Sequence, residues 1–209
     1  MSIIVPNSFY AINQVGVQAN SDGAQTVPRA GRLGELIVND VGLGRYYEAA
    51  RRGKIFHASN AAGQALSVNS TTATGLIITN PPSSGKNIVL LRLVVGITVV
   101  AAGITALILT GDPGPNAAVT HTTPLTPKCS LFGDTTVPVA KVDSAATLAV
   151  ATLQYFLNAA AASPASGVGN VDHEFAGDII MIPGTALSLQ ALTTAETVVA
   201  SLSWAEVDV

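Results

Sequence analysis

Short apolar runs separated by turn residues fill the chain from about residue 54 to its end. Residues 54–59 (KIFHAS) alternate between polar and apolar positions, which predicts a strand with one buried face. Further apolar runs predict strands over 64–69, 75–80, 88–100, 104–110, 145–158, 178–182, 186–191 and 197–206. Strands at this spacing, without helical patterns between them, predict an all-β fold. We expect an antiparallel β-sandwich, with the jelly roll as a natural arrangement and Trp204 packed near an edge.

The N-terminal part of the chain has a different pattern. Residues 1–34 are rich in Asn, Gly and Pro and show no sustained period, so we expect an extended N-terminal arm. The sandwich domain is then expected over residues 35–209, beginning with a short strand at 35–41. Laid over a neighbouring subunit, an arm of this kind adds contact area and becomes ordered only in the assembly.

One short helix is expected over residues 43–52 (LGRYYEAARR). Its residues are good helix formers, Arg51 and Arg52 fall in its last turn, and Gly53 follows where a C-cap glycine is favoured. A helix of this length is not stable alone and must pack against the rest of the protein.

The longest apolar run, residues 88–110, has the length of a membrane span. It is dense in β-branched residues, which favour strands, and it carries Arg92 well inside. Ala101, Ala102 and Gly103 also offer a turn in its middle. We therefore predict two buried strands and no membrane partner.

The chain is poor in charge, and this changes the functional picture. Asp, Glu, Lys and Arg make up 11% of its residues, against about 25% in typical soluble domains. Because charge is depleted at the cores of protein interfaces, we expect partners to cover much of the surface. The net charge of −3 gives no general attraction to nucleic acid or anionic membrane. The single cysteine excludes an internal disulfide, and the N-terminus lacks the pattern of a signal peptide.

The charges that exist are unevenly distributed. Six of the ten basic residues lie between Arg29 and Lys54, and none follows Lys141. The segment after Lys141 holds seven acidic residues: Asp143, Asp172, Glu174, Asp178, Glu196, Glu206 and Asp208. The asymmetry fits head-to-tail contacts between copies, and it equally fits two ordinary solvated faces.

No motif identifies an active site, a cofactor or a metal. The loop PPSSGKN resembles a phosphate-binding loop only faintly, because Asn80 and Asn87 stand where Gly and Ser or Thr are needed. His57, His121 and His173 lack metal-ligand spacing and are expected as single surface or loop residues. The acidic group at 172–178 lacks calcium-loop spacing, and GxSxG is absent. We therefore expect no enzyme and no cofactor.

The segment from Arg45 to Lys54 is the best candidate for binding. It combines Tyr with Arg, a combination typical of interface hot spots. Packing of a short helix and stacking on nucleic-acid bases are the alternatives, and the acidic net charge argues against the latter. The predicted protein-interface residues are Arg29, Arg32, Arg45, Tyr46, Tyr47, Arg51, Arg52 and Lys54.

Three runs resemble a group of tailed-bacteriophage structural proteins: RYYEAARRGKIFHASNAAGQA, TGLIITNPPSSGKNIVLLRLVVG and GDIIMIPGTALSLQALTTAETVVASLSWAEV. They contain an N-P-x-x-S-G-K-N loop before a hydrophobic strand, and a Pro-Gly hairpin before a final S-L-x-W-x-E strand. The resemblance covers roughly residues 43–100 and 176–207. It implies a small β-rich virion subunit that acts as a trimer or another symmetric homo-oligomer.

Three functions follow as expectations. The first is a capsid decoration or cement protein on the virion surface, made in the host bacterial cytoplasm, whose partners are its own copies and the major capsid protein or another virion protein. The second is a receptor- or glycan-binding subunit of a head spike, tail fibre or baseplate, for which an aromatic-rich pocket at a distal tip would be needed. The third, an enzyme on a β scaffold, has no supporting motif.

Overall fold

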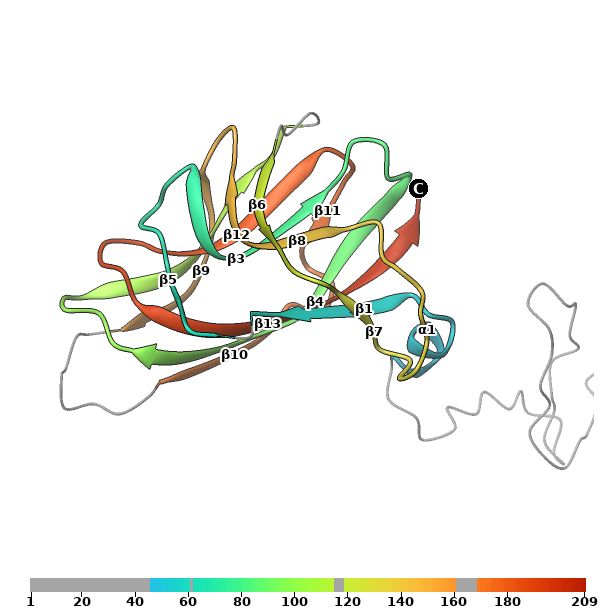
Figure 1. Ribbon diagram of the computed structural model, residues 1–209, viewed down its shortest axis with the longest axis horizontal. Helices are drawn as coiled ribbons and strands as arrows, with labels where there is room; N and C mark the ends of the chain where they lie inside the picture. The colour runs from blue at the N-terminus through green and yellow to red at the C-terminus, as the bar shows by residue number, and fades with distance from the viewer. Residues whose placement is uncertain (1–45, 61, 115–118, 161–168) are drawn as a thin grey trace, which may run out of the picture. The chain divides into compact units, whose positions relative to one another are not determined.

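The computed structural model describes residues 46–60, 62–114, 119–160 and 169–209. Residues 46–209 form one compact unit of two antiparallel β-sheets packed against each other (Figure 1). This confirms the predicted all-β sandwich with one short helix. The predicted arm at 1–34, the predicted strand at 35–41 and the interface candidates Arg29, Arg32 and Arg45 lie outside the described residues.

The first sheet has seven strands, and two long strands pair in its interior. β4 (Lys86–Val99) and β13 (Thr197–Asp208) pair antiparallel over almost their whole length. Along the sheet the order is β10 (Asn170–Glu174), β4, β13, β1 (Ile55–Ser59) and β7 (Lys128–Cys129), while β11 (Ile180–Met181) also pairs with β4 and β2 (Gln64–Ala65) with β13.

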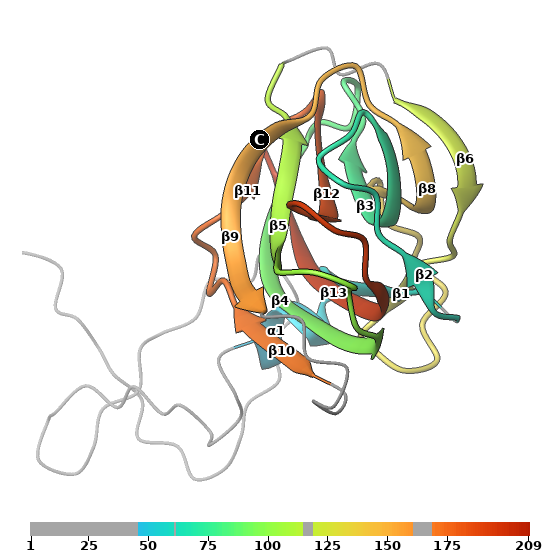
Figure 2. The same ribbon diagram turned by 90° about the vertical axis from the view of Figure 1, so that its left-hand side faces the viewer.

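The second sheet has six strands, and its two edge strands lie on opposite sides of the molecule (Figure 2). The order is β6 (Thr120–Pro124), β8 (Lys141–Thr147), β3 (Thr72–Asn80), β12 (Thr185–Ala191), β5 (Thr105–Asp112) and β9 (Thr152–Ala160). One edge, β9, lies next to β10 of the first sheet, so these two edge strands border the same side of the sandwich.

The longest apolar run forms two strands, as predicted. β4 and β5 occupy different sheets, and residues 100–104 connect them. All eight residues of β5 are buried, which explains why this segment is apolar without alternation. In the part of the chain that the structure describes, no helix has the length and apolarity needed to cross a bilayer.

Two predicted elements have different bounds. The helix α1 is shorter than predicted and spans Tyr47–Arg51; Gly53 follows it with a φ of 64°, as a C-cap glycine requires. The predicted strand over 145–158 is two strands, β8 and β9. The chain bends after Leu148, which is 2% exposed in a small second core, and no Gly or Pro marks the break.

The main core lies between the sheets, and Trp204 is at its centre. The inner positions of β13 alternate regularly through Val198, Ala200 and Leu202 to Trp204, which is fully buried. Its ring centroid is 6.2 Å from that of Phe56 on the neighbouring strand β1. The prediction that Trp204 packs near an edge is wrong, because β13 is an interior strand flanked by β4 and β1.

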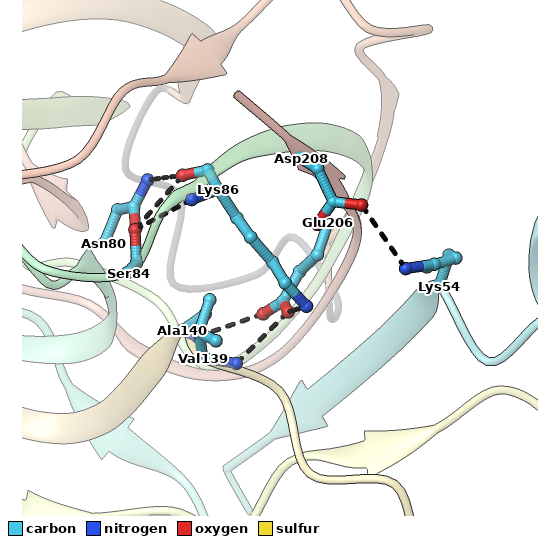
Figure 3. A network of polar contacts seen from close by, with 8 residues as sticks. All are labelled: Lys54, Asn80, Ser84, Lys86, Val139, Ala140, Glu206 and Asp208. Atoms are coloured by element: carbon cyan, nitrogen blue, oxygen red, sulfur yellow. Dashed lines mark hydrogen bonds and ion pairs between the residues drawn. The ribbon is translucent and has the colours of Figure 1, made fainter.

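One end of the sandwich is closed by two buried polar side chains, Asn80 and Glu206 (Figure 3). Asn80 ends β3 and donates hydrogen bonds of 2.8 Å to the carbonyls of Lys86 and Met181, which belong to the other sheet. These bonds tie the second sheet to the first at the point where β4 begins.

Glu206 forms the second connection between the two sheets. Its carboxylate accepts hydrogen bonds from the backbone N–H groups of Val139 (3.1 Å) and Ala140 (3.0 Å), and it forms an ion pair with Lys86 (3.5 Å). Val139 and Ala140 end the loop that leads into β8, so a side chain of the first sheet holds a loop of the second. Such a carboxylate is satisfied in the core because its oxygens all meet donors.

Candidate functional site

Five of the eight predicted interface residues lie in the described part of the chain. Tyr46, Tyr47, Arg51, Arg52 and Lys54 lie on α1 and on the segments that flank it, at the start of β1. Tyr47 is 41% exposed, and Arg51 and Arg52 are exposed. The structure therefore gathers these residues into one surface segment, which we call the α1 segment.

Beside the α1 segment, Tyr46 lines a groove of about 680 Å³. The register of the first sheet brings Ser203, Arg92 and Glu174 into one row across three strands, and all three line this groove. The Arg92 guanidinium donates hydrogen bonds from Nε (2.8 Å) and Nη2 to the two oxygens of Asp172. These hydrogen bonds lower the pKa of the Asp172 carboxyl below its usual value.

A second surface is apolar, and sequence reasoning missed it. It consists of five side chains on β9, on β11 and on the turn after β11, which are 39–57% exposed: Leu153, Tyr155, Phe156, Ile180 and Ile182. We call this group the β9–β11 surface. It lies on the side of the sandwich where edge strands of both sheets end, and Tyr155, Ile180 and Ile182 line a groove of about 360 Å³ there.

Two register shifts in β9 set the directions of these side chains. The pairing with β5 skips Gln154 and Leu157, so Tyr155 lies opposite Leu109 and Phe156 lies opposite Ile108. Cross-strand partners share a face, so Tyr155 points to the core side, as Leu109 does, and Phe156 points to the outer side. Tyr155 stacks there on His173 and Phe175, at centroid distances of 5.3 and 6.2 Å.

The β9–β11 surface is free of charge along the strand. No charged residue or histidine occurs anywhere in residues 144–171, which include all of β9. Among the described strands, β9 pairs only with β5, and none of them pairs with its other edge. The absence of charge in residues 144–171 was the sequence signal for this surface. It was not recognised because the sequence predicted one strand over 145–158, and a single buried strand would also lack charge.

The acidic C-terminal part is not one solvated face. Of its seven acidic residues, Asp143, Glu196 and Glu206 are buried. Asp172 and Asp208 form ion pairs with Arg92 and Lys54. The acids therefore serve mostly within the domain, which weakens the case for head-to-tail contacts based on charge.

Glu196 is 2% exposed, and neither carboxylate oxygen has a hydrogen-bond partner in the structure. Burial raises the pKa of this carboxyl above its usual 4.5, because the ionised form is poorly solvated. The folded state then holds a proton that the unfolded state releases above pH 4.5, so stability is lost as the pH rises through this window.

We therefore expect Glu196→Gln to leave the stability unchanged at pH 4 and to raise it by about 1–3 kcal/mol at pH 8. Urea denaturation of both proteins across this pH range measures the difference. Asp178→Asn, a change at an exposed position, is the control and is expected to show no such trend. A constant difference between Glu196→Gln and the parent at all pH values would contradict the assignment.

The histidines were predicted to be single surface or loop residues, but all three lie on strands and contact neighbouring side chains. His121 lies on β6, and its Nδ1 is 2.6 Å from Oδ2 of the buried Asp143 on β8, which fastens this edge strand to its neighbour. His57 lies on β1, and His173 stacks between aromatic rings. Within the described ranges, no three His, Cys, Asp or Glu side chains come together as a metal site would require.

The protein therefore has two candidate binding regions, the α1 segment with its groove and the β9–β11 surface. The first was predicted in part, since Arg92 and Asp172 joined it only through the sheet register. The second comes from the structure alone. In comparisons with protein-family models, curated proteins and solved structures, nothing matches this chain.

Proposed function

We propose that this protein is a structural subunit of a bacteriophage particle, a capsid decoration or cement protein that binds the shell as a symmetric homo-oligomer. The observation that carries the proposal is the β9–β11 surface. A chain with 11% charged residues exposes five large apolar side chains on β9, on β11 and on the turn after β11. Exposed apolar surface gathered in one region marks sites of protein association.

The virion setting is supported by the resemblance of three runs to tailed-phage structural proteins. The N-P-x-x-S-G-K-N loop connects β3 to β4, and the Pro-Gly turn connects β11 to β12. These four strands and β13 belong to the framework of both sheets. The residues that resemble phage structural proteins therefore lie in the framework of both sheets. A subunit that strengthens a capsid shell needs such a framework.

The α1 segment is the proposed contact to another virion protein. Its exposed Arg51 and Arg52 and its half-buried Tyr46 supply the chemistry of an interface hot spot. The role of Arg29, Arg32 and Arg45 in the same contact remains a prediction from the sequence.

A second candidate is a receptor- or glycan-binding subunit of a spike, fibre or baseplate. The groove beside Tyr46 favours it, since hydroxyl and charged groups of Ser130, Ser203 and Arg92 converge there. Tyr46 is the single aromatic side chain among the residues that line this groove, whereas sugar sites usually need apolar ring faces. We therefore place this candidate second.

Light scattering on the purified full-length protein tests the first proposal. We expect a mass of at least two copies of the 21.2 kDa chain, and the resemblance to phage proteins predicts three. A variant lacking residues 1–34 is expected to keep the same copy number, because the proposed self-contact lies within the sandwich. A monomer over the whole range from micromolar to millimolar would overturn the homo-oligomer.

A further inference from the structure

We infer that the β9–β11 surface is the contact between copies of this chain, and that its occupant is the same surface of a second copy. Such a contact is two-fold and joins two copies, whereas the resemblance to phage proteins predicts three. The inference rests on the proposed function and makes it specific, because it assigns self-association to one side of the sandwich. It differs from the sequence-based prediction, which placed the interface residues between Arg29 and Lys54.

The shape of the β9–β11 surface fits a second copy. The surface carries both a ridge and a hollow of the same apolar chemistry. Leu153 and Phe156 share the outer face of β9, because they lie opposite Thr110 and Ile108 rather than the core residue Leu109. Tyr155, Ile180 and Ile182 line the groove of about 360 Å³. A second copy brings an apolar ridge for this groove and an apolar groove for this ridge.

The lack of charge on β9 also favours a second copy. Two identical surfaces repel each other when they carry net charge, and residues 144–171 carry none. The carboxyl of Asp112 at the groove is 5% exposed and accepts a hydrogen bond from the N–H of Gly114. The nearest exposed acid in sequence is Asp178, two residues before Ile180. A strongly charged partner would find no charge of opposite sign on β9. A second copy brings an equally uncharged β9, so no like charges on these two strands repel each other.

The size of the β9–β11 surface suits a stable interface. A half-exposed aromatic or large aliphatic side chain offers about 100 Å² of surface, so the five side chains offer about 500 Å². A stable interface buries about 800 Å² per partner, of which the apolar centre is the larger part. The surface is therefore large enough to be the centre of such an interface, with the exposed polar residue Asn158 further along β9.

The two bulges in β9 decide how the copies meet. A regular, uncharged edge strand would extend its hydrogen-bond ladder into any neighbouring strand and would aggregate. The shifts at Gln154 and Leu157 interrupt the regular ladder and place Leu153 and Phe156, three residues apart, on the same face. The contact is therefore made by side chains, which limits assembly to one geometry.

Phe156→Glu tests the inference by placing a carboxylate in the centre of the proposed contact. Phe156 is 57% exposed, so the folded monomer tolerates the change. We expect self-association at least about 100-fold weaker than that of the parent protein, measured as the midpoint of a dilution series in light scattering. Ile180→Glu, at a position with the same exposure on β11, is expected to act in the same way and covers the case that the first variant does not fold.

The matched control is Phe132→Glu. Phe132 is fully exposed in the loop between β7 and β8, so the control introduces the same residue change away from the β9–β11 surface. It is expected to leave the copy number unchanged. Circular dichroism confirms the fold of each variant.

The outcomes separate the two proposals. Dissociation by Phe156→Glu or Ile180→Glu, with the control still assembled, supports the inference. Folded Phe156→Glu and Ile180→Glu proteins that stay assembled, or equal dissociation of the control, overturn the inference and leave the proposed homo-oligomer standing. A monomeric parent protein overturns both.

Discussion

Replacement of Glu206 by alanine is expected to lower the free energy of unfolding by about 3–5 kcal/mol. The carboxylate is 2% exposed and accepts two backbone N–H groups while it pairs with Lys86. Its removal leaves the N–H groups of Val139 and Ala140 without an acceptor. Each buried donor left without a partner costs about 1–3 kcal/mol, and the ammonium of Lys86 loses its counter-charge as well.

Urea denaturation measures this loss, and Asp208→Ala is its control. Asp208 lies two residues further along the same strand, but its side chain is 75% exposed and its ion pair with Lys54 spans 3.8 Å. We expect the control to change stability by no more than about 0.5 kcal/mol. Equal effects of the two substitutions would show that Glu206 does not hold the loop before β8.

Trp204→Ala is expected to cost about 3–5 kcal/mol, because it removes the largest side chain of the core and leaves a cavity between the sheets. The indole Nε1 has no hydrogen-bond partner in the structure, so the aromatic ring accounts for most of the stabilisation. Trp204→Phe, which keeps a ring next to Phe56 and removes the unpaired donor, should therefore lose much less.

Thermal and urea unfolding measure both variants, with Phe132→Ala as the control for loss of an exposed aromatic ring. The control is expected to stay within about 0.5 kcal/mol of the parent protein. A loss below about 1 kcal/mol for Trp204→Ala would mean that the core refills the space, which the close packing of protein interiors argues against.

Local sequence patterns predicted many of the strands and the helix. Alternation at 54–59 and the continuous apolar run at 88–110 predicted strands that the structure confirms as β1, β4 and β5. Gly53 predicted the end of the helix, because few other residues adopt its backbone conformation. These signals are readable because each depends on residues close together in the chain.

The positions of Trp204 and Glu206 were not readable in this way. Both lie on a strand that the sequence predicts well, yet its place in the middle of a sheet depends on pairing with strands more than 100 residues earlier in the chain. The same pairing buries a carboxylate that sequence reasoning counted among the acids of a tail. Burial is a property of neighbours, and a single strand does not specify its neighbours.

The two candidate surfaces also combine features that are visible in the sequence with features that depend on the fold. The Tyr- and Arg-rich composition of the α1 segment and the absence of charge in residues 144–171 can be read directly from the amino-acid sequence. The position of Arg92 and Asp172 beside the α1 segment, and the meeting of β9 and β11 at one side of the sandwich, became visible only in the folded protein. Composition is set residue by residue, whereas a surface is assembled from strands whose order and register are fixed by the packing of both sheets.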